Sequence, residues 1–162
     1  MKKSLFLTIL LFSALAGITK GQTFDWNIRG GLNIMNGQPS GEDIYLGYHA
    51  GFQAGVRVSY WGFYAEGLYS VHQNQDGGDP IAYLIPGINI KRYVKQFLFV
   101  DFGGALLMVP GDTELSENTL NPENKLVYMA GIGAKISVVE LSMRVLSRTS
   151  YGVIQVTAAL KF

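Results

Sequence analysis

The feature that most constrains this chain is a strict alternation of apolar and polar residues, sustained over stretches of ten residues or more. Residues 24–36 read FDWNIRGGLNIMN, so one face of an extended chain carries aromatic and aliphatic side chains, and the other carries charges and amides. Side chains on a strand alternate between two faces, whereas a helix groups residues three and four apart. The segment therefore predicts a β-strand.

The same period recurs along the rest of the sequence and predicts eight strands. They cover residues 24–36, 45–60, 63–72, 81–92, 97–109, 125–137, 139–147 and 151–162. A soluble strand averages about five or six residues, whereas a tilted transmembrane strand needs about 9–11. Together the length and the even count predict an all-β fold, an antiparallel up-and-down transmembrane barrel of eight strands. Pro86 cannot donate a ladder hydrogen bond, so a β-bulge is expected in the fourth strand.

The beginning of the chain has the three parts of a secretory signal. Two lysines precede an uncharged, mostly apolar stretch at 4–18, and small residues stand at the −3 and −1 positions of a cleavage site after Gly21. The stretch is short for a spanning helix, which needs about 20 apolar residues. We therefore expect a cleaved signal peptide at 1–21 and a barrel domain at 22–162, with an uncleaved helical anchor as the alternative.

Composition excludes several kinds of function. The chain has no cysteine, so it offers no lipidation site, disulfide framework or thiolate metal site. Its formal charge is +1, and loss of residues 1–21 removes three lysines and no acid, which leaves −2. This balance gives no reason to expect a nucleic-acid partner. No motif predicts a cofactor.

Long and short connections alternate between the predicted strands. Long or polar loops cover residues 37–44, 73–80 and 110–124. Tight links are expected near residues 61–62, 94–96 and 137–138. Outer-membrane barrels have short periplasmic turns and longer outer loops, so the loops are expected on the outside. These loops are acidic, which is consistent either with ordinary solvated charge or with divalent cations shared with lipopolysaccharide phosphates.

The polar face predicts the contents of the barrel. It carries charges of both signs, at Asp25, Arg29, Arg57, Glu66, Asp101, Lys135, Glu140, Arg144 and Lys161. Unlike charges in that number suit a narrow interior that is filled by paired side chains, as expected for eight strands. A soluble lipocalin-like barrel, with the apolar face inward, is the main alternative.

Aromatic residues gather at both ends of the predicted strands, as in the interfacial belts of membrane proteins. The turn end has Trp26, Tyr60, Trp61, Phe63, Tyr93, Phe97 and Phe162. The loop end has Tyr48, Tyr83, Tyr128 and Tyr151. Two belts favour the membrane orientation, with the apolar face outward.

The chain resembles the small eight-stranded outer-membrane barrels, the OmpA/OmpX type and the porin-like "outer membrane protein beta-barrel domain" group. The resemblance covers nearly the whole of residues 22–162. It is carried by the segments FDWNIRGGLNIM, IPG, VDFGGALL and VIQVTAALKF. It implies a location in the bacterial outer membrane, among lipid and lipopolysaccharide. It also implies that Phe162 is the C-terminal aromatic by which the barrel-assembly machinery recognises its clients.

One group of residues merits consideration for catalysis. Glu66, Ser70 and His72 share one face of one strand, and hydrolases use a hydroxyl, an imidazole base and an orienting carboxylate. Residues two apart share a face in any strand, and no oxyanion donors accompany them, so we assign no catalytic residue. His49 falls on the same inward face as His72, but the two histidines lack a recognisable ligand spacing, and we predict no metal site.

These features predict a non-enzymatic outer-membrane barrel with a structural or surface-interaction role. The alternatives are a barrel subunit of an envelope or secretion assembly, a lipid-modifying enzyme, and a narrow channel.

Overall fold

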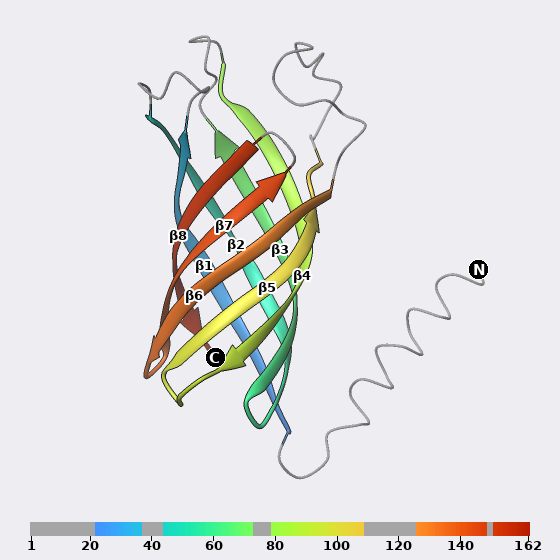
Figure 1. Cartoon of the computed structure of the whole chain (residues 1–162), viewed down its shortest axis with the longest axis vertical. Coiled ribbons are helices and arrows are strands. Elements are labelled where there is room, and N and C mark those ends of the chain that lie inside the picture. Colours follow the sequence, from blue (N-terminus) through green and yellow to red (C-terminus); the bar gives the residue numbers. More distant parts are fainter. Residues whose placement is uncertain (1–21, 37–43, 73–78, 109–125, 149–150) are drawn as a thin grey trace, which may run out of the picture.

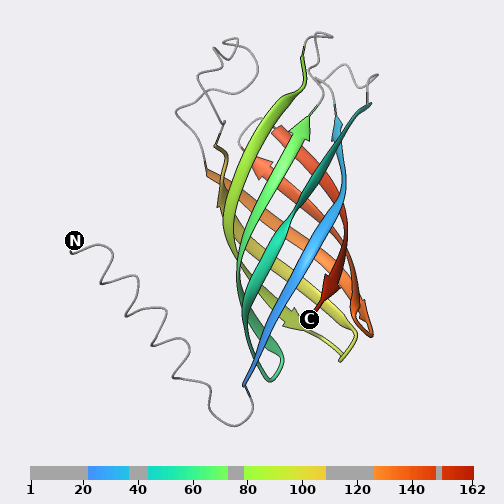
Figure 2. The ribbon, with the colours of Figure 1, turned by 180° about the vertical axis from the view of Figure 1, so that it is seen from behind.

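A computed structural model describes residues 22–36, 44–72, 79–108, 126–148 and 151–162, which form a closed barrel of eight antiparallel strands (Figure 1 and, from behind, Figure 2). Each strand pairs with its neighbours in sequence, and the first pairs with the last. The predicted fold class is confirmed. The strands are β1 (Gln22–Asn36), β2 (Ile44–Val58), β3 (Trp61–His72), β4 (Ile81–Tyr93), β5 (Leu98–Leu106), β6 (Leu126–Ile136), β7 (Val139–Arg148) and β8 (Tyr151–Lys161).

Several sequence predictions fall on parts of the chain that the structure does not describe. The signal peptide predicted at 1–21 lies outside the described residues, as do the loop segments 37–43, 73–78, 109–125 and 149–150. Most of the acidic loop residues belong to these segments. Among the described residues there is no helix long and apolar enough to cross a membrane.

The strands are staggered as a closed barrel requires. Following paired residues around the wall leads from Asp25 through Gly55, Tyr64, Asn89, Gly103, Met129, Leu146 and Val153 back to Met35. The path returns to β1 ten residues further on. With about 3.3 Å per residue and about 4.8 Å between strands, this stagger gives a tilt of about 40°, within the usual range for barrels.

Pro86 does not produce the bulge that the sequence predicted. Gly87 pairs with Ala105 and Leu84 with Met108, in one unbroken register along β4 and β5. Leu84 and Met108 exchange two backbone hydrogen bonds, so the backbone polar groups of Leu84 face β5. Every second residue of a strand faces the same neighbour, so the nitrogen of Pro86, which has no hydrogen to donate, also faces β5. The ladder with β3 is therefore complete, and only the β4–β5 ladder is interrupted.

The tight turns lie together at one end of the barrel, and the strand ends that border the undescribed segments lie at the other (Figure 1). The turn predicted at residues 137–138 is confirmed, but the turn predicted near 61–62 lies at Ser59–Tyr60, two residues earlier. The cause is that Trp61 and Gly62 are already paired with β2. Ser59 has φ 56° and Ser137 has φ 57°, each at the first position of its two-residue turn. Type II′ turns require this conformation, and they favour glycine there.

Because Ser137 has a positive φ, the stability of the barrel is expected to depend on how well a substituted residue adopts that conformation. An L-residue in the left-handed region costs about 1–2 kcal/mol, and a β-branched residue adds strain there. We expect Ser137→Val to unfold at a lower urea concentration than Ser137→Gly, with a difference of about 1–2 kcal/mol. Urea titration of the barrel folded in vesicles measures this difference. Equal stability of the two variants would contradict the turn assignment.

The apolar face points outward and the polar face inward. Outward residues such as Ile28, Phe52 and Ile132 are exposed along the middle of the wall, whereas Asn33 and Gln53 on the other face are fully buried. This orientation excludes the lipocalin-like alternative. The apolar exterior is what a barrel wall in lipid requires.

The aromatic belts are smaller than predicted. Of the residues predicted in the belt at the turn end, six are exposed: Trp26, Tyr60, Trp61, Phe63, Phe97 and Phe162. At the loop end, Tyr48 and Tyr128 are exposed. Tyr83 and Tyr93 were predicted in the belts but are buried inside the barrel, because both lie at inward positions of β4. The side chain of Tyr151 is outside the described residues.

Candidate functional site

The candidate site is the interior of the barrel, where charged side chains converge from the wall. The described part of the chain buries four cations and four anions inside. They are Arg29, Lys91, Arg144 and Lys161, and Asp25, Glu66, Asp101 and Glu140. Equal numbers of buried charges are expected, because a charge without a partner is costly away from water.

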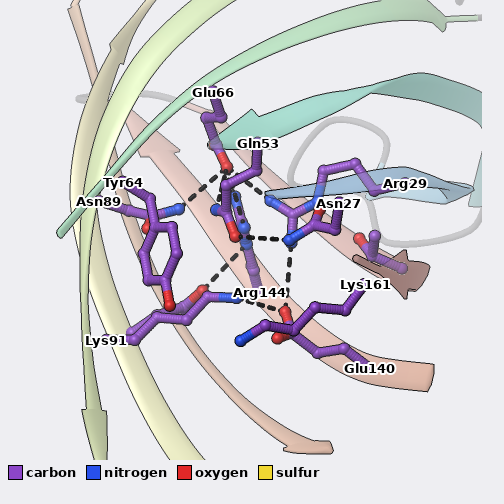
Figure 3. Close-up of polar contacts among 12 residues, drawn as sticks. Asn27, Arg29, Gln53, Tyr64, Glu66, Asn89, Lys91, Glu140, Arg144 and Lys161 are labelled. Carbon is purple, nitrogen blue, oxygen red and sulfur yellow. Dashed lines mark hydrogen bonds and ion pairs between the residues drawn. The ribbon is translucent and has the colours of Figure 1, made fainter. Parts of the chain in front are cut away.

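Glu66 on β3 is the centre of this network (Figure 3). Its carboxylate accepts hydrogen bonds from Arg29 at 2.6 Å and from Arg144 at 2.7 and 3.1 Å. The side-chain amides of Gln53 and Asn89 also donate to it, at 3.1 and 2.9 Å. Donors from β1, β2, β4 and β7 thus converge on one side chain.

The contact between Glu66 and Arg144 spans the lumen. In a ring of eight strands, β3 and β7 are four places apart and lie on opposite sides. Two side chains that meet at 2.7 Å from opposite walls leave no open path between them at that level. Together with Arg29, Gln53 and Asn89, which donate to the same carboxylate, this contact fills the interior at the level of Glu66 with the protein's own side chains.

Further ion pairs extend the network toward the turn end. Glu140 is paired with Lys91, and it lies 3.6 Å from Arg29. Asp25 is paired with Lys161 and accepts a hydrogen bond from Tyr64 at 3.2 Å. Each anion thus holds together strands that are distant in sequence.

Asp101 completes the set of anions. One of its carboxylate oxygens lies 3.2 Å from Nε of Arg144. A Cβ added to Gly131, on the adjacent strand β6, would lie 2.5 Å from Asp101 Oδ1 and 2.6 Å from the backbone oxygen of Met143. Only glycine leaves room here for the contact between Asp101 and Arg144.

Two of the nine charged residues predicted in the interior are less enclosed than the rest. Arg57 and Lys135 are half-buried near the turn end. The guanidinium of Arg57 stacks over the ring of Tyr93 at 4.1 Å. Sequence analysis omitted Lys91, which is fully buried and forms the pair with Glu140. The signal was its position two residues from Asn89, on the same face of β4.

A second polar cluster fills the loop end. Asn33 donates to Ser70 at 2.8 Å and accepts from Gln155 at 3.1 Å. The ring nitrogens of His49 contact Asn33 at 2.9 Å and Thr157 at 3.0 Å. These side chains are joined by hydrogen bonds and not by ion pairs, so the cluster is a hydrogen-bonded plug.

The structure brings together only two of the three residues considered for catalysis. Ser70 Oγ and His72 Nε2 are 2.7 Å apart, and both residues are buried. The carboxylate of Glu66 is bound by arginines, six residues along the strand from His72 or about 20 Å at the usual rise. Glu66 therefore does not orient the imidazole, and Ser70 also accepts a hydrogen bond from Asn33.

The described residues hold no cluster of three histidine, cysteine or acidic side chains that could bind a metal ion. Both ring nitrogens of His49 and one of His72 are in hydrogen bonds with protein groups. The two histidines thus contribute to packing and hydrogen bonding in the plug.

Beside the polar cluster, the loop end has an apolar interior that sequence analysis missed. It consists of Leu68, Tyr83, Ile85, Ala105, Val127, Met129, Leu146 and Val153. These residues occupy inward positions on β3 to β8, whereas the polar cluster comes from β1, β2, β3 and β8, so the two share the loop end of the lumen. The barrel thus has apolar packing inside as well as outside at this end.

Phe162 lies at the junction of β1 and β8. Its ring stacks on Trp26 with centroids 4.5 Å apart, and its backbone exchanges hydrogen bonds with that residue. The ring remains exposed on the outer wall.

Comparison with known proteins identifies the fold. No family model and no curated protein matches the chain. Two solved structures are similar over nearly their whole length. A transmembrane β-barrel from a de novo design study is 14% identical with a TM-score of 0.51, and covers 89% of this chain and 98% of its own. Neisserial surface protein A (NspA) is 13% identical with a TM-score of 0.51, and covers 88% and 98%. The chain therefore has the fold of a transmembrane β-barrel.

Proposed function

We propose that this protein is a bacterial outer-membrane barrel with a closed lumen, which acts as a structural or surface-interaction element of the envelope. The observation that carries the proposal is the contact between Glu66 and Arg144 across the lumen. Amide and apolar side chains fill the interior above it. A barrel filled in this way has a wall and two ends, but no passage for sugars or peptides.

The outer membrane is proposed as the location because of the fold and the exterior. The wall is apolar, with aromatic side chains toward both ends, and lipid is the environment that such a surface fits. One of the two similar structures is the Neisserial surface protein NspA. On this proposal the tight turns lie in the periplasm and the loops face outward, where lipopolysaccharide and envelope proteins are the available partners.

The placement of Ser70, the candidate nucleophile, supports a non-enzymatic role. Ser70 is fully buried inside the barrel and hydrogen-bonded to Asn33 and His72. An enzyme acting on lipid needs a nucleophile that reaches the membrane. Ser70 faces away from the outer wall.

We also propose that Phe162 serves as the recognition signal for the barrel-assembly machinery. Its exposed ring at the junction of β1 and β8 is accessible from the outer wall. Phe162 directly follows β8, the strand whose pairing with β1 closes the barrel, and this position is consistent with recognition before the barrel closes.

Electrical recording in planar bilayers tests the closed lumen. We expect the inserted barrel to show no stable open level, because the ion pairs and the plug block the path of hydrated ions. Insertion is verified by resistance to extraction with urea and by the shifted gel mobility of folded barrels. Stable steps of large conductance from verified protein would overturn the proposal.

A further inference from the structure

The outward face of the barrel carries one charged side chain among the strand residues described. Arg92 lies on β4, one residue before that strand ends, and its side chain is half-buried. All other outward positions of the described strands are apolar or uncharged. A cation on the lipid face costs about 2–4 kcal/mol at mid-depth and about 0–1 near the interface, so its place at the turn end is the tolerable one.

Arg92 lies over two aromatic rings. Its guanidinium carbon lies 4.9 Å from the ring centroid of Trp61 and 5.4 Å from that of Tyr60. Trp61 is the residue paired with Arg92 across the β3–β4 ladder, and Tyr60 precedes it in the turn. Both rings are exposed on the outer wall. Stacking uses the face of the guanidinium and leaves its N–H donors at the edge.

Within the described residues, no acidic side chain forms an ion pair with Arg92. Among the ion pairs of the described chain, all the carboxylates involved face the interior, and none lies within 4 Å of Arg92. The charges nearest to Arg92 along the chain have the same sign, since Lys91 is paired with Glu140 inside the barrel and Lys95 is exposed in the adjacent turn. The surroundings of Arg92 therefore favour an anion that comes from outside the protein.

We propose that Arg92, Trp61 and Tyr60 form a binding site for the phosphate of a phospholipid in the membrane leaflet at the turn end. This inference rests on the proposed membrane location. A guanidinium binds phosphate through two parallel N–H donors, which a single ammonium does not provide. Aromatic rings at headgroup depth present an apolar body to the glycerol and upper acyl chains. Arg92 thus suits the phosphate of the lipid, and the two rings suit its glycerol and upper acyl chains.

Native mass spectrometry of the folded barrel in detergent tests the site. The probes are phosphatidylglycerol, diacylglycerol with the same chains, and inorganic phosphate. We expect wild-type protein to retain phosphatidylglycerol, and Arg92→Gln to bind it about tenfold more weakly, as the loss of a charge-assisted hydrogen bond implies. Arg92→Lys should fall between the two. Lys95→Gln is the matched control, since it removes a charge at the same end without touching the rings, and should change binding less than twofold.

Any one of the following results would overturn the site. They are equal binding by wild-type protein and Arg92→Gln, equal retention of diacylglycerol and phosphatidylglycerol, and a loss in Lys95→Gln as large as that in Arg92→Gln. Retention of inorganic phosphate alone would also do so, because the proposal requires the lipid. Gel mobility verifies that each variant is folded. The two tests can fail separately. A barrel that conducts ions but binds phosphatidylglycerol through Arg92 would contradict the closed lumen and support this site. A barrel that does not conduct and binds the lipid equally well without Arg92 would contradict this site alone.

Discussion

Glu66→Gln is expected to lower the free energy of unfolding by about 3–5 kcal/mol, because it removes one partner from a buried ion pair. The substitution keeps the size of the side chain and takes away the negative charge that Arg29 and Arg144 share. Both guanidiniums then remain buried, with Asp101 3.2 Å from Arg144 and Glu140 3.6 Å from Arg29 as the remaining anions of the described interior. Urea unfolding of the barrel in phospholipid vesicles, followed by gel mobility, measures the loss.

A double variant separates charge imbalance from loss of packing. Glu66→Gln combined with Arg144→Met removes one charge of each sign and keeps the interior balanced. Replacement of a whole buried pair by uncharged groups is often close to neutral, so the double variant should recover most of the stability. An unchanged urea midpoint in the single variant would show that Glu66 does not stabilise the wall. A double variant less stable than the single one would show that size and shape determine the effect.

Ile132→Arg is expected to destabilise the barrel by about 2–4 kcal/mol, because it places a cation on the lipid face near the middle of β6. Ile132 is 57% exposed in the isolated chain, so the new side chain meets no protein group that could clash. The cost comes from the surrounding lipid. The measurement is the same urea titration in vesicles.

Val138→Arg is the matched control for Ile132→Arg. Val138 is 56% exposed, similar to Ile132, but lies in the tight turn between β6 and β7. Near the interface the cost falls to about 0–1 kcal/mol. Equal effects of the two substitutions, or a stabilising effect of Ile132→Arg, would mean that water and not lipid surrounds the wall.

The alternation of side chains was sufficient to predict the barrel, because the period of two acts at every residue and needs no knowledge of partners. It was insufficient for Tyr83 and Tyr93, which were assigned to the belts by residue type and by nearness to strand ends. Both stand at odd-numbered positions of β4, as do the inward residues Asn89 and Lys91. Their place in the strand determines which way they face, and a tyrosine fits a packed interior when its hydroxyl has a partner, as that of Tyr93 has in Tyr64.

The partners of Glu66 were beyond sequence analysis for a different reason. Arg144 lies 78 residues away along the chain, on a strand that is not adjacent in the sheet. Its approach depends on the stagger of the whole barrel, which is the result of eight separate registers. A shift of two residues in any one of them keeps every side chain on its face and yet changes which charges meet. The composition of the network can therefore be read from the sequence, whereas its connections require the structure.

The junction of β1 and β8 has a consequence for how the protein reaches its folded state. The ion pair of Lys161 with Asp25 joins residues 136 positions apart, and the stack of Phe162 on Trp26 lies beside it. Contacts so remote along the chain are slow to form, since the intervening chain must be ordered first. Until then the sheet has two unpaired edges, each of which can template pairing with another molecule. We expect closure of this junction to be the late step of assembly. On the proposed outer-membrane location, the open sheet is the species that a periplasmic chaperone would protect.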